Sequence, residues 1–119
     1  MRVLVDTNIW IDYLRQTEPV LVDLLERDQV CVHQSVITEL ALGNLRDRAI
    51  FLKLMIVRAV GYRGVRHLVE ERRLWGRGLS AVDAALLASV VVTPVVLLWT
   101  RDKRLRHAAR DVGVLADIE

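Results

Sequence analysis

The sequence predicts an α/β protein, a three-layer α/β/α sandwich around a mainly parallel, roughly five-stranded sheet. Short apolar runs rich in β-branched residues alternate with longer helical patterns along the chain. These runs lack regular polar alternation, which is typical of strands buried on both faces of a parallel sheet. The 119 residues, of which 53% are hydrophobic and 27% charged, suffice for one domain with a substantial core, and such a composition excludes a disordered chain.

Five apolar runs predict the strands. The first run enters directly from the N-terminus, and the fourth follows a Thr-Pro pair that separates it from the preceding helical pattern. All five are short, as strands usually are. The predicted strands are Arg2–Val5, Val30–Val32, Val57–Val60, Val95–Trp99 and Val114–Ala116.

Seven segments between these runs predict helices. Pro19 suits a first helical position, where its missing N–H costs nothing. Ser35 and Ser80 suit N-caps, and Gly43 and Gly113 suit helix ends. The predicted helices are Ile9–Leu14, Pro19–Arg27, Ser35–Leu42, Asp47–Met55, Val65–Trp75, Ser80–Val91 and Lys103–Asp111.

Four acidic residues occupy positions that this topology brings toward one edge of the sheet. Asp6 follows the first strand and Asp102 follows the fourth. Glu39 lies early in the helix after the second strand, and Asp83 lies in the first turn of the helix before the fourth. Ligands of parallel sheets bind at the carboxyl ends of the strands. We therefore expect an acidic cup at this edge.

Each acid taken alone also has a structural explanation. Asp6 and Asp102 suit helix N-caps, Asp83 completes a capping box with Ser80, and Glu39 suits the positive end of a helix dipole. However, Glu39 and Asp83 are flanked by apolar residues, so both are expected to be partly buried and to need a partner.

A divalent cation would provide that partner. Neighbouring carboxylates repel one another, and a hard cation such as Mg²⁺ takes oxygen ligands while using only one or two carboxylates directly. Such an ion also polarises a phosphodiester and activates water. Zinc fits less well, because His and Cys are nearly absent from these positions.

The formal net charge of +2 permits nucleic-acid binding without requiring it. Arg101 and Lys103 flank Asp102 and are expected to position a phosphate backbone. The three tryptophans are expected in the core or at interfaces, because their scattered positions give no base-stacking pattern. The three histidines form no ligand motif, and His33 is expected to be structural.

The expected compartment is the cytoplasm. Cys31 is the only cysteine, so no intramolecular disulfide forms, as is usual in a reducing environment. The N-terminal segment lacks the apolar core of a secretory signal, and no apolar stretch reaches the roughly 20 residues of a spanning helix. No association with a membrane is expected.

Four segments, in order, carry a resemblance to a known family: VLVDTNIWIDYL, SVITELALG, GLSAVDAALLAS and LLWTRDKRL. The chain resembles PIN-domain proteins of the toxin type called VapC, over nearly its whole length. The resemblance implies a single PIN-like nuclease domain over residues 1–119. It also implies an Mg²⁺- or Mn²⁺-dependent endoribonuclease that hydrolyses RNA phosphodiester bonds as the toxin of a type II toxin–antitoxin pair.

The resemblance also implies roles for particular residues and partners. The family's acids map onto Asp6, Glu39, Asp83 and Asp102, and its site-ordering polar residues onto Asn8 and Thr100. Relatives are usually homodimers, held by an antitoxin of the VapB type whose C-terminal segment covers the acidic cleft.

Two alternatives remain open from the sequence. The chain is short for this family, and residues 43–78 look compressed, so a catalytically silent PIN-like module that binds nucleic acid or antitoxin is the second hypothesis. The third is a receiver-like phosphoacceptor domain. The sequence disfavours it, because no paired acids end the first strand and no lysine follows the last predicted strand.

Overall fold

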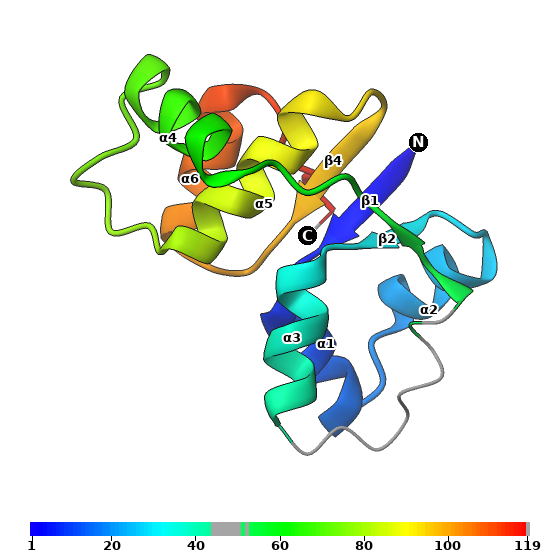
Figure 1. The fold of residues 1–119 in the computed structure, drawn as a ribbon. Helices are drawn as coiled ribbons and strands as arrows, with labels where there is room; N and C mark the ends of the chain where they lie inside the picture. Colours follow the sequence, from blue (N-terminus) through cyan, green and yellow to red (C-terminus); the bar gives the residue numbers. More distant parts are fainter. Residues whose placement is uncertain (44–50, 52, 119) are drawn as a thin grey trace.

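A parallel four-stranded sheet lies at the centre of the structure, a computed structural model that describes residues 1–43, 51 and 53–118. The strand order is β3-β2-β1-β4, and every pairing is parallel (Figure 1). The strands are β1 (Arg2–Val5), β2 (Val30–Val32), β3 (Met55–Ile56) and β4 (Val96–Trp99).

The register of β1 and β4 fixes the position of the candidate site. The two strands pair from Arg2 with Val96 through Val5 with Trp99, so they end at the same level. The Asp6 N–H then donates to the Trp99 carbonyl at 3.0 Å. Residue 6 and the segment from residue 100 onward therefore leave the sheet side by side, as expected for the carboxyl ends of neighbouring parallel strands.

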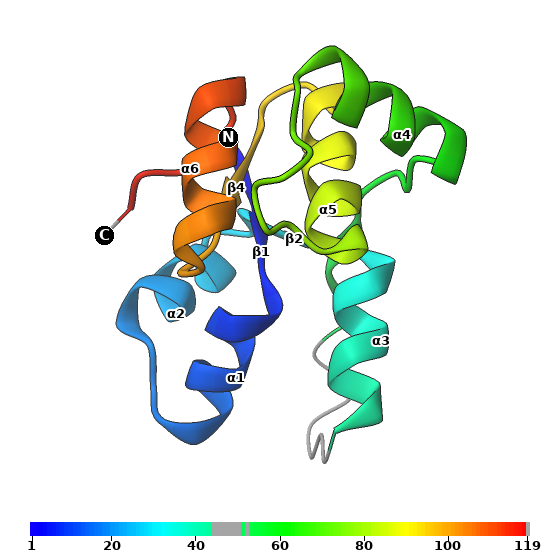
Figure 2. The ribbon, with the colours of Figure 1, turned by 90° about the vertical axis from the view of Figure 1, so that its left-hand side faces the viewer.

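Six helices cover the two faces of the sheet within the described ranges. Figure 2 shows α1, α2 and α6 on one side of the sheet and α3, α4 and α5 on the other. The predicted three-layer α/β/α sandwich is confirmed. The helices are α1 (Thr7–Arg15), α2 (Pro19–Glu26), α3 (Gln34–Leu42), α4 (Tyr62–Glu71), α5 (Ala81–Val92) and α6 (Lys103–Val112).

The prediction of five strands was wrong. Within the described ranges, the segment 114–116 forms only an isolated bridge between Leu115 and Leu98, because Gly113, at a φ of 85°, turns the chain and only a short stretch then runs along β4. The third strand also lies two residues earlier than predicted. Its partner β2 ends at Val32, where His33 begins to cap α3, so residues 58–60 have no strand to pair with. Most of the predicted helix Asp47–Met55 lies outside the described residues, and Met55 itself belongs to β3.

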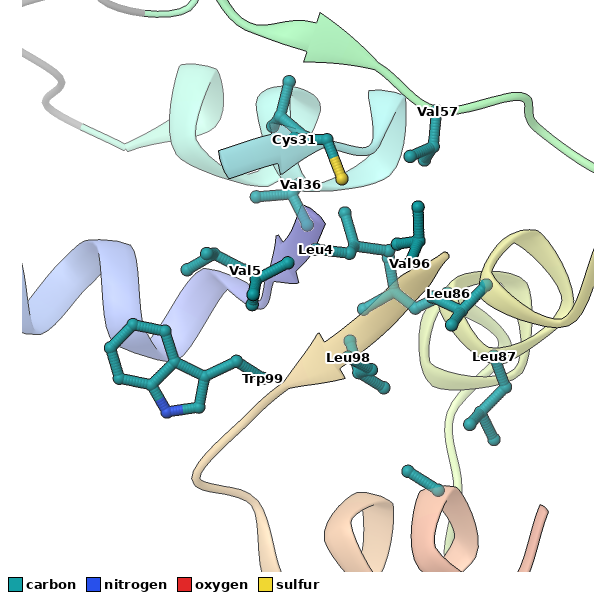
Figure 3. Close-up of a cluster of buried hydrophobic side chains, with 14 of the residues drawn as sticks. Leu4, Val5, Cys31, Val36, Val57, Leu86, Leu87, Val96, Leu98 and Trp99 are labelled. Carbon is teal, nitrogen blue, oxygen red and sulfur yellow. The ribbon is translucent and has the colours of Figure 1, made fainter. Parts of the chain in front are cut away.

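The core is apolar on both faces of the sheet, as the lack of polar alternation predicted. Leu4 and Val5 of β1 and Leu98 and Trp99 of β4 are fully buried, and Leu86 of α5 packs against this cluster (Figure 3). Cys31 lies in the same core, and burial raises the pKa of its thiol to about 11. None of the described helices is both long and apolar enough to cross a bilayer.

Candidate active site

Asp6 is a buried carboxylate between β1 and α1, with 7% of its surface exposed. Its Oδ1 accepts from the Thr7 N–H at 2.7 Å, and its Oδ2 accepts from the Thr100 hydroxyl at 2.7 Å. Burial raises the pKa of Asp6; the hydrogen bonds from Thr100 and Thr7 lower it, and the negative charges of Asp83 and Glu39 raise it. The structure thus brings three of the four predicted acids within electrostatic reach of one another.

Thr100 connects Asp6 to the fourth acid. It follows β4, is fully buried, and donates its hydroxyl proton to Asp6. The same hydroxyl oxygen accepts from the Asp102 N–H at 3.1 Å. A single side chain therefore fixes the Asp6 carboxylate and the turn on which Asp102 stands.

Glu39 reaches the site from α3, where it is the sixth helical residue. It lies in the second turn, because the helix begins one residue earlier than predicted and its N-cap is His33 instead of Ser35. Its Oε1 accepts from the Thr7 hydroxyl at 2.7 Å, and its side chain is otherwise exposed. Thr7 thus holds both Asp6, through its N–H, and Glu39, through its hydroxyl.

Asp83 forms the predicted capping box at the start of α5. The Ser80 hydroxyl accepts from the Asp83 N–H at 3.1 Å, and Asp83 Oδ2 accepts from the Ser80 N–H at 3.0 Å. The structural explanation for this acid is correct, yet the same carboxylate lies close enough to raise the pKa of Asp6. Capping and proximity to the site are therefore compatible.

Asp102 is the N-cap of α6, as its position after β4 suggested. Its Oδ1 accepts from the Leu105 N–H at 3.0 Å, and the side chain is exposed. Lys103, the first residue of α6, is also exposed. Both side chains are thus accessible to a ligand that approaches this edge.

The structure places Arg101 in an ion-pair network that the sequence did not suggest. Its guanidinium lies 2.6 Å from Asp12 of α1 and 2.8 Å from Glu18, the residue before α2, and it stacks over the Trp99 ring at 5.7 Å. The hydrogen bonds from Arg101 lower the pKa of Glu18. Arg101 was predicted to position a phosphate backbone; in this conformation it joins α1, the start of α2 and the end of β4.

The donor chemistry of this edge fits a hard divalent cation. Each Asp6 oxygen accepts only one hydrogen bond, which leaves lone pairs available, and the Oδ1 of Asn8 is buried without a hydrogen-bond partner in the described part of the chain. Carboxylate and amide oxygens are the ligands that Mg²⁺ and similar ions take. Among the described residues, however, no group of three or more His, Cys, Asp or Glu side chains is already arranged to hold an ion. Glu39, Asp83 and Asp102 are instead hydrogen-bonded to neighbouring residues.

The capping box allows a direct test of how Asp83 is held. Ser80→Ala should lower the free energy of unfolding by about 1 kcal/mol, because the Asp83 N–H loses its acceptor. Ser89→Ala on the same helix is the matched control, since the buried Ser89 hydroxyl has no hydrogen-bond partner among the described residues. Urea denaturation of both variants measures the difference. Equal stabilities of the two variants would show that the box contributes nothing.

Two comparisons place the chain among known proteins. The PIN domain family model matches residues 3–111. Two curated proteins named Ribonuclease VapC32, from Mycobacterium tuberculosis strains CDC 1551 / Oshkosh and ATCC 25618 / H37Rv, are each 47% identical to this chain over 116 residues, which covers 94% of this chain and 94% of each relative. The chain therefore belongs to the PIN-domain family and is of the VapC type.

Proposed function

We propose that the protein is a divalent-metal-dependent endoribonuclease, the toxin of a type II toxin–antitoxin pair. The observation that carries this proposal is the buried Asp6 carboxylate, whose pKa is raised by burial and by the charges of Asp83 and Glu39. Such a group is unfavourable without a cation beside it. The 47% identity to proteins named ribonucleases supports RNA as the substrate.

The four acids would hold an Mg²⁺ or Mn²⁺ ion, directly or through water, with Asn8 as an additional oxygen donor. When bound, the ion supplies positive charge at the phosphodiester and makes water a stronger nucleophile. Asp6 is the most firmly positioned ligand, because Thr7 and Thr100 fix both of its oxygens. Rigid ligands of this kind keep a metal site in its productive geometry.

The exposed acids have a second role in this proposal. Glu39 is reachable by solvent, and within the described residues its side chain is held by a single hydrogen bond, from Thr7, so it is suited to accept the proton of the attacking water. Lys103, exposed beside Asp102, is suited to contact a neighbouring RNA phosphate. Arg101 would support the site indirectly, because it holds α1 and the start of α2 against the end of β4.

The proposal includes the partners that the VapC type implies. A VapB-type antitoxin would cover the acidic edge, and a basic side chain inserted there would neutralise the acids much as the cation does. A homodimer and a cytoplasmic location complete the proposal.

Cleavage of RNA by the purified protein tests this function. Wild-type protein should cleave a long single-stranded RNA with Mg²⁺ or Mn²⁺, lose the activity with EDTA, and regain it when excess metal is returned. Asp83→Asn should be inactive, whereas Asp23→Asn on the exposed face of α2 should be as active as wild type. If wild type and Asp83→Asn bound RNA or antitoxin equally well and neither protein cleaved RNA, the silent binding module would be favoured instead.

A further inference from the structure

A pocket of about 620 Å³ opens between the N-terminus of α3, α4 and α5, in the part of the fold where α4 and α5 lie together in Figure 1. Its lining is mainly apolar and includes Val65, Val69 and Leu74. This volume lies within the range of about 300–1,000 Å³ that is usual for small-ligand sites. None of the four candidate metal-binding acids lines it.

The pocket shares a wall with the candidate active site. Ser80, Ala81 and Ala84 line it, and these residues form the N-cap and first turn of α5. Asp83 belongs to the same turn and is hydrogen-bonded to Ser80. A group bound in the pocket would therefore lie on one side of this turn, next to an acid of the site.

Two aromatic side chains line the pocket without being part of the core. Trp75 is 56% exposed and Tyr62 is 85% exposed. Of the two places expected for the tryptophans, the core or an interface, the exposed Trp75 does not occupy the core, and its ring is accessible to a ligand. Trp75 stands before Gly76 and Gly78, whose φ values of 73° and 75° form the tight turn leading to Ser80. The turn thus connects Trp75 to Ser80, the N-cap of α5 that is hydrogen-bonded to Asp83.

Polar groups accompany these rings. Arg66, an exposed cation on α4, lines the pocket. His33 also lines it and is 98% buried, since only 2% of its surface is exposed. Its Nδ1 accepts from the Ser35 N–H at 2.9 Å, so its proton resides on Nε2, which has no hydrogen-bond partner in the described ranges. Nε2 is itself closed to solvent, so in this conformation His33 contributes to the wall of the pocket without presenting this donor to a ligand.

We propose that this pocket binds one unpaired nucleobase of the RNA substrate, next to the phosphate that is cleaved. The base would stack on Trp75, with Arg66 beside the backbone and the apolar side chains of the pocket around the base. A flat aromatic ligand with a neighbouring negative charge matches the exposed ring and the cation, whereas a purely apolar peptide side chain would leave the cation unused. The inference rests on the proposed function, since it specifies how the same site holds its substrate.

Binding measured without cleavage tests the subsite separately from the activity. The probe is a short fluorescein-labelled single-stranded RNA that wild type binds, kept in EDTA, together with a set of RNAs that each lack one base. Trp75→Ala should weaken binding of the intact RNA about tenfold, because stacking of a base on an aromatic ring is lost. Trp75→Phe should retain most of the affinity. Val92→Ala, an exposed apolar residue near the far end of α5, is the control and should bind like wild type.

The decisive result is that the losses of RNA affinity caused by Trp75→Ala and by removal of one particular base do not add. One abasic RNA should bind wild type about tenfold more weakly than the intact RNA, and Trp75→Ala should bind that same RNA with no further loss. The proposal would be overturned if Trp75→Ala weakened the binding of every abasic RNA by the same additional factor. It would also be overturned by an unchanged RNA affinity of Trp75→Ala combined with loss of the dimer or of antitoxin binding, because the pocket would then be a protein interface. If wild type bound RNA with this non-additive pattern and yet did not cleave it with Mg²⁺ or Mn²⁺, the proposed function would be wrong, whereas the base-binding pocket would be supported.

Discussion

Asp6→Asn is expected to reduce RNA cleavage on the order of 10³-fold or more and to make the metal-free protein more stable. The activity falls because the best-positioned oxygen ligand of the proposed metal site loses its charge. The stability rises because the buried carboxylate has a raised pKa in the folded protein, so its ionised form opposes folding. Asparagine keeps an oxygen for the Thr7 N–H, and its amide can donate to the Thr100 hydroxyl.

The pH dependence of the free energy of unfolding isolates the contribution of the Asp6 carboxylate. Unfolded Asp6 ionises near pH 3.8, whereas the folded carboxyl keeps its proton to a higher pH. Wild type in EDTA should therefore lose stability as the pH rises from about 3.8 through the raised pKa of Asp6, and the loss should persist above it. Urea denaturation of wild type and Asp6→Asn across this range measures the difference, with Asp23→Asn as the control. Parallel curves for wild type and Asp6→Asn would contradict the assigned charge state.

Thr100→Val should lower the apparent affinity for Mn²⁺ by about 10- to 100-fold, the usual cost of removing a group that orients a metal ligand. Valine has a similar shape but cannot donate to Asp6, so the hydrogen bond that lowers the pKa of Asp6 disappears. The Asp102 N–H also loses its acceptor. The pH at which cleavage reaches half of its maximum should therefore move upward.

Thr100→Ser separates this positioning role from a loss of packing. Serine retains the hydroxyl and loses a buried methyl group, so it should restore most of the Mn²⁺ affinity and the original pH profile while costing some stability. Cleavage rates measured against Mn²⁺ concentration at several pH values give both quantities. If Thr100→Val retained the wild-type affinity and pH profile, Thr100 would have no part in the site.

The sequence allowed prediction of the features that depend on local spacing. The capping box joins Ser80 and Asp83 across three residues, and Asp102 caps α6 with its own side chain, so neighbouring residues are enough to predict these bonds. The three-layer fold followed equally well from the unbroken apolar runs. The edge at which Asp6 and Asp102 meet followed from the rule for parallel strands.

Contacts between distant segments could not be predicted in the same way. Thr7 and Glu39 are 32 residues apart, and Arg101 and Glu18 are 83 residues apart. The Thr7–Glu39 bond depends on how α1 and α3 pack, and the Arg101–Glu18 bond on how the segment after β4 lies against the start of α2; periodicity fixes neither. The only local signal for Thr7 is a hydroxyl between Asp6 and Asn8, and such a residue is common in first turns of helices. The sequence also left open whether Trp75 lies in the core or at an interface, because its exposure depends on the turn at Gly76 and Gly78.

Soaking crystals of the protein in Mn²⁺ shows whether Asp6 lies in a metal site with Asp83 and Glu39 beside it. An anomalous difference map should contain a peak within coordinating distance of an Asp6 oxygen, with Asp83 or Glu39 in its first or second ligand sphere. The same soak of Asp6→Asn should lack this peak. A map without an Mn²⁺ peak at Asp6, or with one equally strong in Asp6→Asn, would contradict the account.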